Sequence, residues 1–543
     1  MVYCGKPSKA CVECRLRRTK CDTLTPSCSQ CIRASRTCTG YRTESDMMFR
    51  DQTQHYANKR RTQNESRMIV SRRRTKASNA TSEISIDPQL IDEPKMQQLV
   101  RRTAPFTLGL STSAAEQAAC YFFRNYVLED KSTSGSFQYL HDIYGNEIIG
   151  PALIDSIESL GMVGLANFWK SPDLHFHAHR KYNSALRLVS SRLRNEEEAR
   201  ADQTLVAVML LGLYETNTCT GPQSMQSWTK HTIGASSLMQ LRGKQCLETS
   251  IGRNLFLHLR AQVITNCLQR HVAIPAVIRD WSKYTLQFQS RNDAHATILS
   301  KQIMKFCDLR ASMSSFHDYS NAENIVSACL AIDAKLVEWA LTYPSDCMFY
   351  KTITLKQGSD NIFSDYYHVY DSVWAATLWN HYRCVRILIN EVVYVQLTYI
   401  KSTRPDSFSL ELRNPIFSDS QLEAFITTVI QLSHDICASV PFMLGYKEGE
   451  EVTLSSAKAV SGNLLLWPLY TAACTSVVSN VMCHWVAERL RIISDVMGIK
   501  QAAPLSHILI KRKDLLAWEL EDVKKGTPPK YEDWTHGQLM ELT

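Results

Sequence analysis

Six cysteines near the start of the chain constrain its fold more than any other feature of the sequence. Their spacing is C-x2-C-x6-C-x6-C-x2-C-x6-C, so one unit, C-x2-C-x6-C, occurs twice with Pro26 in the turn between the copies. A C-x2-C pair lets two thiolates converge on one tetrahedral Zn²⁺ ion. The spacing therefore predicts a small domain organised by metal. The cysteines are Cys11, Cys14, Cys21, Cys28, Cys31 and Cys38.

The number of thiolates limits how metal can be bound. Two separate tetrahedral zinc sites need eight ligands, and six thiolates suffice only if two of them bridge both ions. The repeat points to the first cysteine of each copy, Cys11 and Cys28, as the bridging pair. Histidine cannot supply the missing ligands, because the first histidine of the chain is His55. We therefore predict two zinc ions per chain and exclude a Cys₂His₂ finger and a RING-type site.

Two other interpretations of the cysteines are weaker. A disulfide-bonded domain suits a secreted chain, but the N-terminus lacks the apolar segment of a signal peptide, so we expect an intracellular chain whose thiols bind metal. A metallothionein-like buffer would not need the basic residues between the ligands. Residues 1–76 contain 18 Lys/Arg and 6 Asp/Glu, whereas the whole chain carries a net charge of only +8. This asymmetry predicts a polyanion partner for the N-terminal region.

The cysteine segment resembles the fungal zinc binuclear cluster (Zn₂Cys₆) family of transcription factors. The resemblance rests on the six cysteines and on the basic run Arg15-Leu16-Arg17-Arg18-Thr19-Lys20, where the family carries its recognition helix. It supports Cys11 and Cys28 as bridging ligands and implies binding to CGG triplets in the major groove of double-stranded DNA. It also implies two further partners, a second copy of the chain in a dimer and the transcription machinery.

Charge indicates which half of the cluster reads DNA. Two Zn²⁺ ions and six thiolates leave a charge of −2, which nearby cations must reverse before the cluster can approach phosphate. The first half has four such cations, whereas the second has only Arg33 and Arg36. We expect the first half to contact bases and the second to contact backbone. The predicted DNA-binding residues are Arg15, Arg17, Arg18 and Lys20.

The sequence predicts three regions, a DNA-binding domain at 1–42, a disordered basic linker at 43–105 and a large all-α regulatory domain at 106–543. The linker is polar and has no sustained heptad, so we expect the isolated head to be monomeric. Two basic clusters in it resemble a bipartite nuclear localisation signal and predict a nuclear protein, although extra phosphate affinity is an alternative use. The basic residues are Lys59, Arg60, Arg61, Arg72, Arg73, Arg74 and Lys76.

Apolar residues at helical spacing predict the all-α body. Leu210–Glu215, Trp228–Ala235 and Leu241–Gly243 resemble the helical regulatory domain that follows the cluster in many fungal factors. Trp228 and His231 share a helix face and are interpreted as packing residues. The expected helical stretches are Ala114–Leu128, Tyr182–Arg194, Gln203–Tyr214, Trp228–Leu241, Ile325–Leu341 and Ser372–Tyr394, with breakers at Gly221-Pro222, Asn414-Pro415, Gly445 and Pro504.

Three weaker signals have two interpretations each. His175 and His179 share a helix face, which suits a metal site or, far more commonly, a polar surface. The uncharged run from Ala459 to Ala487 contains Pro468 and polar residues, so we expect a buried helix or helix pair and no membrane span. The mixed acidic and apolar segment at 531–542 suits an activation segment or, preferably, a docked terminal helix.

The function expected from these patterns is transcriptional. The sequence has no G-x-G-x-x-G, P-loop, H-E-x-x-H or G-x-S-x-G motif, so an enzyme is the weaker alternative. A cluster protein that acts only as a partner or repressor is a third. We predict a nuclear regulator of RNA polymerase II transcription that reads CGG-type sites. By analogy with the family, its targets are the genes of a metabolic, including secondary-metabolite, gene cluster.

Overall fold

The structure is a computed structural model of the 543-residue chain. It describes residues 10–17, 19–38, 113–128, 137–146, 148–219, 221–313, 321–342, 350–355, 360–403, 419–445 and 458–511. The chain forms two compact units, Met1–Val100 and Arg101–Thr543. Four predicted features lie outside the described residues. They are the linker at 43–105 with the seven residues of the predicted localisation signal, Arg18, Asn414-Pro415 and the segment 531–542.

The described part of the first unit contains two one-turn helices, α1 (Val12–Leu16) and α2 (Ser29–Arg33). Each begins directly after the first cysteine of one C-x2-C-x6-C copy. Cys28 caps α2, because its side chain accepts a hydrogen bond from the backbone N–H of Cys31. The turn between the copies contains a cis peptide bond between Thr25 and Pro26.

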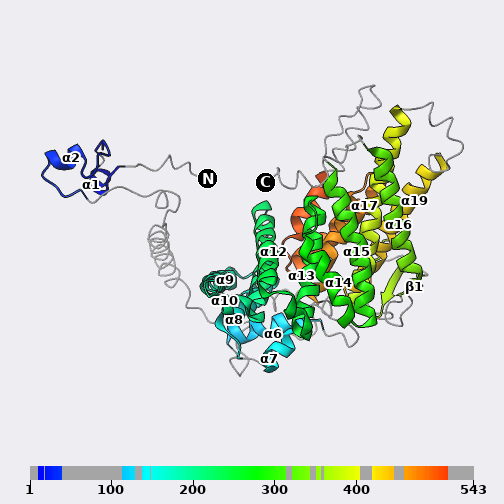
Figure 1. The fold of residues 1–543 in the computed structure, drawn as a ribbon, viewed down its shortest axis with the longest axis horizontal. Coiled ribbons are helices and arrows are strands. Elements are labelled where there is room, and N and C mark those ends of the chain that lie inside the picture. The colour runs from blue at the N-terminus through cyan, green and yellow to red at the C-terminus, as the bar shows by residue number, and fades with distance from the viewer. Residues whose placement is uncertain are drawn as a thin grey trace, which may run out of the picture. The chain divides into compact units, whose positions relative to one another are not determined.

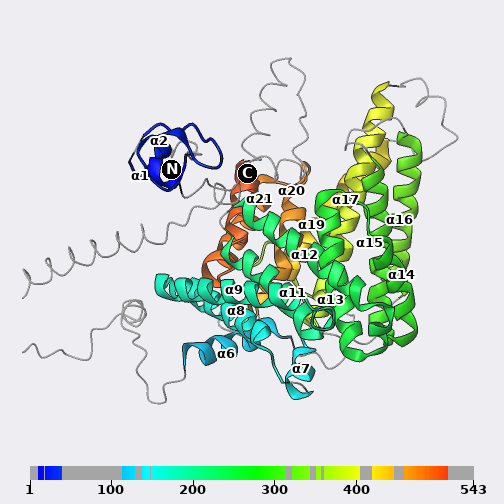
Figure 2. The same cartoon turned by 60° about the vertical axis from the view of Figure 1, so that its left-hand side comes forward.

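The second unit is built almost entirely of α-helices (Figure 1). Figure 2 shows α14, α15, α16 and α17 side by side. The first helices of the unit are α6 (Ala114–Tyr126), α7 (Leu140–Asn146), α8 (Pro151–Trp169), α9 (Pro172–Arg192), α10 (Glu196–Arg200), α11 (Asp202–Thr218), α12 (Pro222–Arg242) and α13 (Ser250–Arg270). They are followed by α14 (Ala276–Thr285), α15 (Arg291–Ser312), α16 (Ala322–Thr342), α17 (Val373–Thr403), α19 (Asp419–Met443), α20 (Ala459–Cys474) and α21 (Asn480–Val496), with short 3₁₀ turns at Lys244–Glu248 and Leu286–Phe288.

The helices begin where the sequence supplies capping groups. Ser113 and Glu116 form a capping box at α6, in which the Ser113 hydroxyl accepts from Glu116 N and the Glu116 carboxylate accepts from Ser113 N at 2.7 Å. Pro222 is the first residue of α12, so the predicted breaker at Gly221-Pro222 marks a helix start. Pro504 does not break a helix, because it lies in the first turn of the helix at 502–511.

The core lies around α8 and α11, which are buried on nearly all sides. α8 packs against α6, α9 and α11. α6 and α8 touch backbone to backbone, since a Cβ atom at Gly161 would overlap the carbonyl oxygen of Ala118. The body is thus held by apolar burial along helices that are distant in the sequence.

The expected helices are present. All six predicted stretches lie in helices α6, α9, α11, α12, α16 and α17, apart from one or two residues at helix ends. α9 begins ten residues earlier than expected because Ser171 caps it and Pro172 follows. The first turns of α9 are mostly polar, so apolar spacing does not reveal that they are helical.

One antiparallel hairpin interrupts the all-α expectation. Strands β1 (Tyr350–Thr354) and β2 (Tyr366–Tyr370) pair with Tyr350 opposite Tyr370. β2 is covered by α19 and α17, so Tyr367, His368 and Tyr370 are all buried. Burial on both faces removes the alternation by which a strand is recognised, and the hairpin was therefore not predicted.

The uncharged run at 459–487 forms the expected helix pair, α20 and the first half of α21. Leu465, Leu469 and Val486 are fully buried in the body. Within the described residues, no helix has both the length and the apolar character needed to span a membrane.

Candidate metal centre

The six cysteine thiols converge in the first unit. The sulfur atoms form two groups, and within each group all the sulfurs lie within 4.8 Å of one another. One group is Cys11, Cys14, Cys21 and Cys28, and the other is Cys11, Cys28, Cys31 and Cys38. The two groups share Cys11 and Cys28, the pair that the sequence repeat singles out.

The sulfur positions fit zinc. The Sγ–Sγ distances are 3.7 Å for Cys11–Cys28, 3.6 Å for Cys14–Cys28 and 3.7 Å for Cys11–Cys31. A tetrahedron with Zn–S bonds of about 2.3 Å has edges of about 3.8 Å. The arrangement corresponds to two tetrahedra of thiolates with a common edge, the geometry that six ligands and two ions require.

Backbone groups hold the two shared sulfurs in place. Cys14 N donates to Cys11 Sγ at 3.5 Å, and Cys31 N donates to Cys28 Sγ at 3.4 Å. Both contacts come from the first turn of a helix, where N–H groups are free and attract negative charge. The repeated sequence thus builds the same thiolate environment twice.

Burial opposes thiolate formation in the protein alone. Cys11 and Cys28 are fully buried, and desolvation raises the pKa of Cys11 to about 12 and shifts the pKa of Cys28 in the same direction. A Zn²⁺ ion held by these sulfurs would favour the thiolates, so its binding would be coupled to proton release and to folding of the segment.

Sequence reasoning missed one residue that orders the cluster. Both carboxylate oxygens of Asp22 accept from the backbone N–H of Ser29 at 3.2 Å. Hydrogen bonding to Ser29 also lowers the pKa of Asp22. Asp22 therefore ties the end of the first copy to the start of α2, and the only sequence signal for it is an acid seven residues before a helix N-terminus.

The predicted DNA-binding residues follow the first half of the cluster. Arg15 lies in α1, Arg17 and Lys20 follow it as exposed residues, and Arg18 is outside the described part. Thr19 N donates to Cys14 O at 3.0 Å and fixes the chain beyond α1. Arg33 and Arg36 are exposed on the second half. Cationic groups thus flank a cluster whose own charge is negative.

The weaker candidates do not form a second metal site. Among the described residues, the groups arranged to hold a metal ion are the two cysteine groups. His175 is partly exposed and His179 is exposed on α9, which supports the polar-surface interpretation. His231 packs against Gly212, and its Nε2 lies 3.5 Å from the Tyr182 hydroxyl.

Comparison with known proteins matches both regions. Residues 9–47 match the fungal Zn(2)-Cys(6) binuclear cluster domain. Residues 132–294 match the fungal specific transcription factor domain. The chain carries the two domains of a fungal transcription regulator. The cluster is accordingly a DNA-binding domain that binds two zinc ions, and the matched families are regulatory ones, with no catalytic family among them.

A curated relative adds little about function. An uncharacterised protein of Emericella nidulans, AN5342, is 31% identical over 87 residues. The match covers 16% of this chain and 18% of that protein. No solved structure matches the chain.

Proposed function

We propose that this chain is a nuclear, sequence-specific regulator of RNA polymerase II transcription that reads CGG-type sites in double-stranded DNA. The observation that carries the proposal is the pair of thiol groups with a common edge, bordered on one side by basic residues. In this assignment the chain is a regulator and not an enzyme, and the helical body controls its output.

The proposed metal ligands are the six cysteines, with Cys11 and Cys28 bridging the two ions. The remaining four thiolates each bind one ion, Cys14 and Cys21 the first and Cys31 and Cys38 the second, as the two sulfur groups suggest. Bound zinc supplies the charge that holds six thiolates together and takes the place of an apolar core. In this proposal the six cysteines hold α1 in the position from which it enters the major groove of DNA.

The proposed base-reading residues are Arg17 and Arg18, with Arg15 and Lys20 nearer the phosphates. Guanine presents O6 and N7 as paired acceptors in the major groove, which suit a guanidinium. Arg17 is exposed at the end of α1, where it is free to reach a base edge. Four cations on one half and two on the other support the first half as the reader.

Binding of the full zinc-loaded chain to two labelled duplexes tests this function. One duplex contains two CGG triplets and the other contains the same bases in scrambled order. We expect the CGG duplex to bind at least about tenfold more tightly, since each lost base contact costs about 1–3 kcal/mol. Equal affinity for the two duplexes would reject CGG recognition and leave a nonspecific DNA binder.

The nuclear assignment has a separate test. Replacing Arg72, Arg73, Arg74 and Lys76 with Ala in a fluorescent fusion should leave the protein largely outside the nucleus. A fusion with these four residues intact is the control. An unchanged nuclear signal would mean that import does not depend on the second basic cluster.

The proposed targets are genes of a metabolic pathway, including a secondary-metabolite gene cluster. The only support is the layout of a cysteine cluster followed by a fungal regulatory domain. Genome-wide occupancy mapping in the source organism tests it, and dispersed binding at unrelated genes would reject it. Binding of the chain to duplexes with one and with two CGG triplets would show whether it acts as a dimer.

A further inference from the structure

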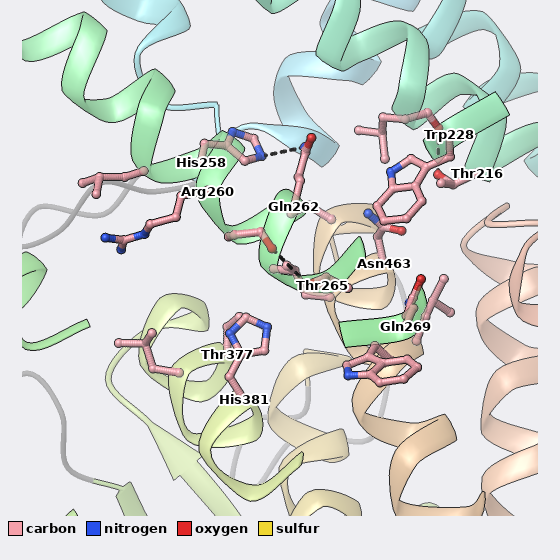
Figure 3. Close-up of a pocket in the computed structure, with 18 of the residues that line it drawn as sticks. Thr216, Trp228, His258, Arg260, Gln262, Thr265, Gln269, Thr377, His381 and Asn463 are labelled. Atoms are coloured by element: carbon pink, nitrogen blue, oxygen red, sulfur yellow. Dashed lines mark hydrogen bonds between the residues drawn. The ribbon is translucent and has the colours of Figure 1, made fainter. Parts of the chain in front are cut away.

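The helical body contains a partly open cavity of about 540 Å³. It is lined by α13 on one side and by α17 and α20 on the other, with α11 and α12 contributing at one end (Figure 3). This size is within the range of about 300–1,000 Å³ that is typical of small-molecule sites. The cavity lies in the regulatory body and contains none of the cysteines of the metal centre.

Five aromatic residues, three of them tryptophans, contribute to the apolar part of the lining beside a larger number of aliphatic side chains. Their flat faces favour stacking or edge contacts with the rings of a ligand. Trp228, interpreted from the sequence as a packing residue, is only partly buried because it lines the cavity. The aromatic lining residues are Phe137, Trp228, Trp374, Trp467 and Tyr470.

Two histidines in the wall are neutral at physiological pH. Burial lowers the pKa of both His258 and His381 to about 4. The ring of His258 already has partners, because its Nδ1 lies 3.1 Å from the Tyr139 hydroxyl and its Nε2 lies 3.4 Å from Gln262 Nε2. Figure 3 shows His258 on α13 and His381 on the facing helix. The histidines therefore add hydrogen-bonding groups but no charge.

Arg260 supplies a buried positive charge to the wall. Its side chain is 4% exposed, and its Nη1 donates to Thr297 Oγ1 at 2.9 Å. Among the described residues its Nε has no hydrogen-bond acceptor, and no ion pair joins the guanidinium to a carboxylate. The nearby Asp293 carboxylate accepts from Ser290 Oγ at 2.8 Å, and its charge offsets only part of the effect of desolvation on the pKa of Arg260. Desolvation lowers the pKa of Arg260 to about 10, so it remains charged at neutral pH.

A buried guanidinium without a bound anion is costly, and a ligand anion would relieve that cost. We propose that the cavity binds an aromatic small molecule with a single anionic group, such as an aryl carboxylate, whose charge is neutralised by Arg260. One deep cation favours a monoanion over a di- or trianion. The ring system lies against the tryptophans, and the ligand bridges α13 to α17 and α20. Binding does not depend on the proposed DNA site, although any effect on transcription does.

A matched pair of fluorescent probes tests the proposal on the full zinc-loaded chain. 8-Anilinonaphthalene-1-sulfonate is an aromatic monoanion, and N-phenyl-1-naphthylamine is the same ring system without the anion. We expect both to bind the cavity and to brighten there. Arg260→Met should raise the dissociation constant of the anionic probe by at least about tenfold. It should leave that of the neutral probe within about twofold.

Three variants make the result specific. Arg187→Met removes an exposed arginine from α9 and should change neither probe. Thr265→Trp fills the cavity and should weaken both, whereas Thr398→Trp, at an exposed helical threonine with the same hydrogen bond to a preceding carbonyl, should not. Thermal melts show which variants fold. If Arg260→Met does not fold, Thr265→Trp still tests the cavity, because that variant keeps Arg260.

Three results would overturn the proposal. Equal losses of the two probes in Arg260→Met, or no loss of either, would mean that Arg260 does not select an anion. Undiminished binding of both probes to Thr265→Trp would place them elsewhere on the protein. Absence of binding to the wild-type chain at millimolar probe would reject the cavity as a site for this class of ligand.

Discussion

The two units of this protein are stabilised by different means. In the described part of the first unit the buried cluster consists of Cys11, Cys14, Cys28 and Cys31, while Leu16 and Ile32 are 75% and 64% exposed. In the body, side chains such as Phe256 and Leu210 are fully buried in one continuous apolar core. So short a segment cannot bury enough apolar surface to fold, and metal–thiolate bonds replace that core. Perturbing metal and perturbing packing should therefore affect different units.

The largest effect is expected from removing one zinc ligand. Cys14→Ser should abolish binding to both CGG and scrambled duplexes and lower the bound zinc from two ions per chain, because α1 loses its anchor. The melting temperature of the body should not change. Metal analysis, duplex binding and a thermal melt measure the three quantities. Cys120→Ser, at an exposed cysteine of α6, is the matched control and should be silent in all three.

A core truncation in the body is expected to produce the opposite pattern. Phe256 is fully buried, so Phe256→Ala should lower the free energy of unfolding by about 3–5 kcal/mol. Zinc content and DNA affinity at low temperature should be those of the wild-type chain. Urea unfolding followed by tryptophan fluorescence gives the stability, and Phe168→Ala at a 56% exposed site is the control. A loss of zinc in Phe256→Ala would contradict the independence of the units.

Two arginines of the cluster should separate specificity from general affinity. Arg18→Ala should cost about 1–3 kcal/mol on the CGG duplex and much less on the scrambled one. Arg15→Ala should weaken both duplexes alike and reduce the salt dependence by about one unit of slope. Titrations at several salt concentrations distinguish these outcomes. Loss of specificity in Arg15→Ala alone would mean that the other face of α1 enters the groove.

A more gradual effect is expected from acid. Burial lowers the pKa of His258 and His381 to about 4 and that of His368 to about 3, all below the ordinary value of 6.5. The unfolded chain binds these protons first, so the stability of the body is full above about pH 6.5 and falls towards pH 4. Each histidine contributes a slope of up to about 1.4 kcal/mol per pH unit. His381→Gln should therefore flatten the decline measured by urea unfolding, and an unchanged slope would show that His381 is not buried as a neutral ring.

Local signals made much of the fold and all six metal ligands predictable. The ligands of the centre lie within 28 residues, and their spacing alone specifies which sulfurs meet. Helices such as α6 and α12 carry their own capping and apolar patterns, for example Ser113 with Glu116. Such features depend on residues a few positions apart, which is the range over which sequence patterns can be read.

The cavity and the hairpin could not be predicted for the same reason. The cavity is lined by residues of several helices, which only tertiary packing brings together. Examples are Trp228, Arg260, His381 and Asn463, each from a different helix. In the sequence each resembles an ordinary helical residue. β2 is hidden because burial on both faces removes its alternation. A site formed by residues that are distant in the sequence can be identified only from the folded structure.

The edge common to the two thiol groups has a thermodynamic consequence. Because Cys11 and Cys28 belong to both groups, a zinc ion held by one group would also order two of the four ligands of the other. The cost of deprotonating and ordering these two thiols is then met once for two ions. Loading should consequently be cooperative, with few chains holding a single ion. The head would then pass from unfolded to DNA-competent over a narrow interval of free zinc concentration, and metal supply would act as a threshold.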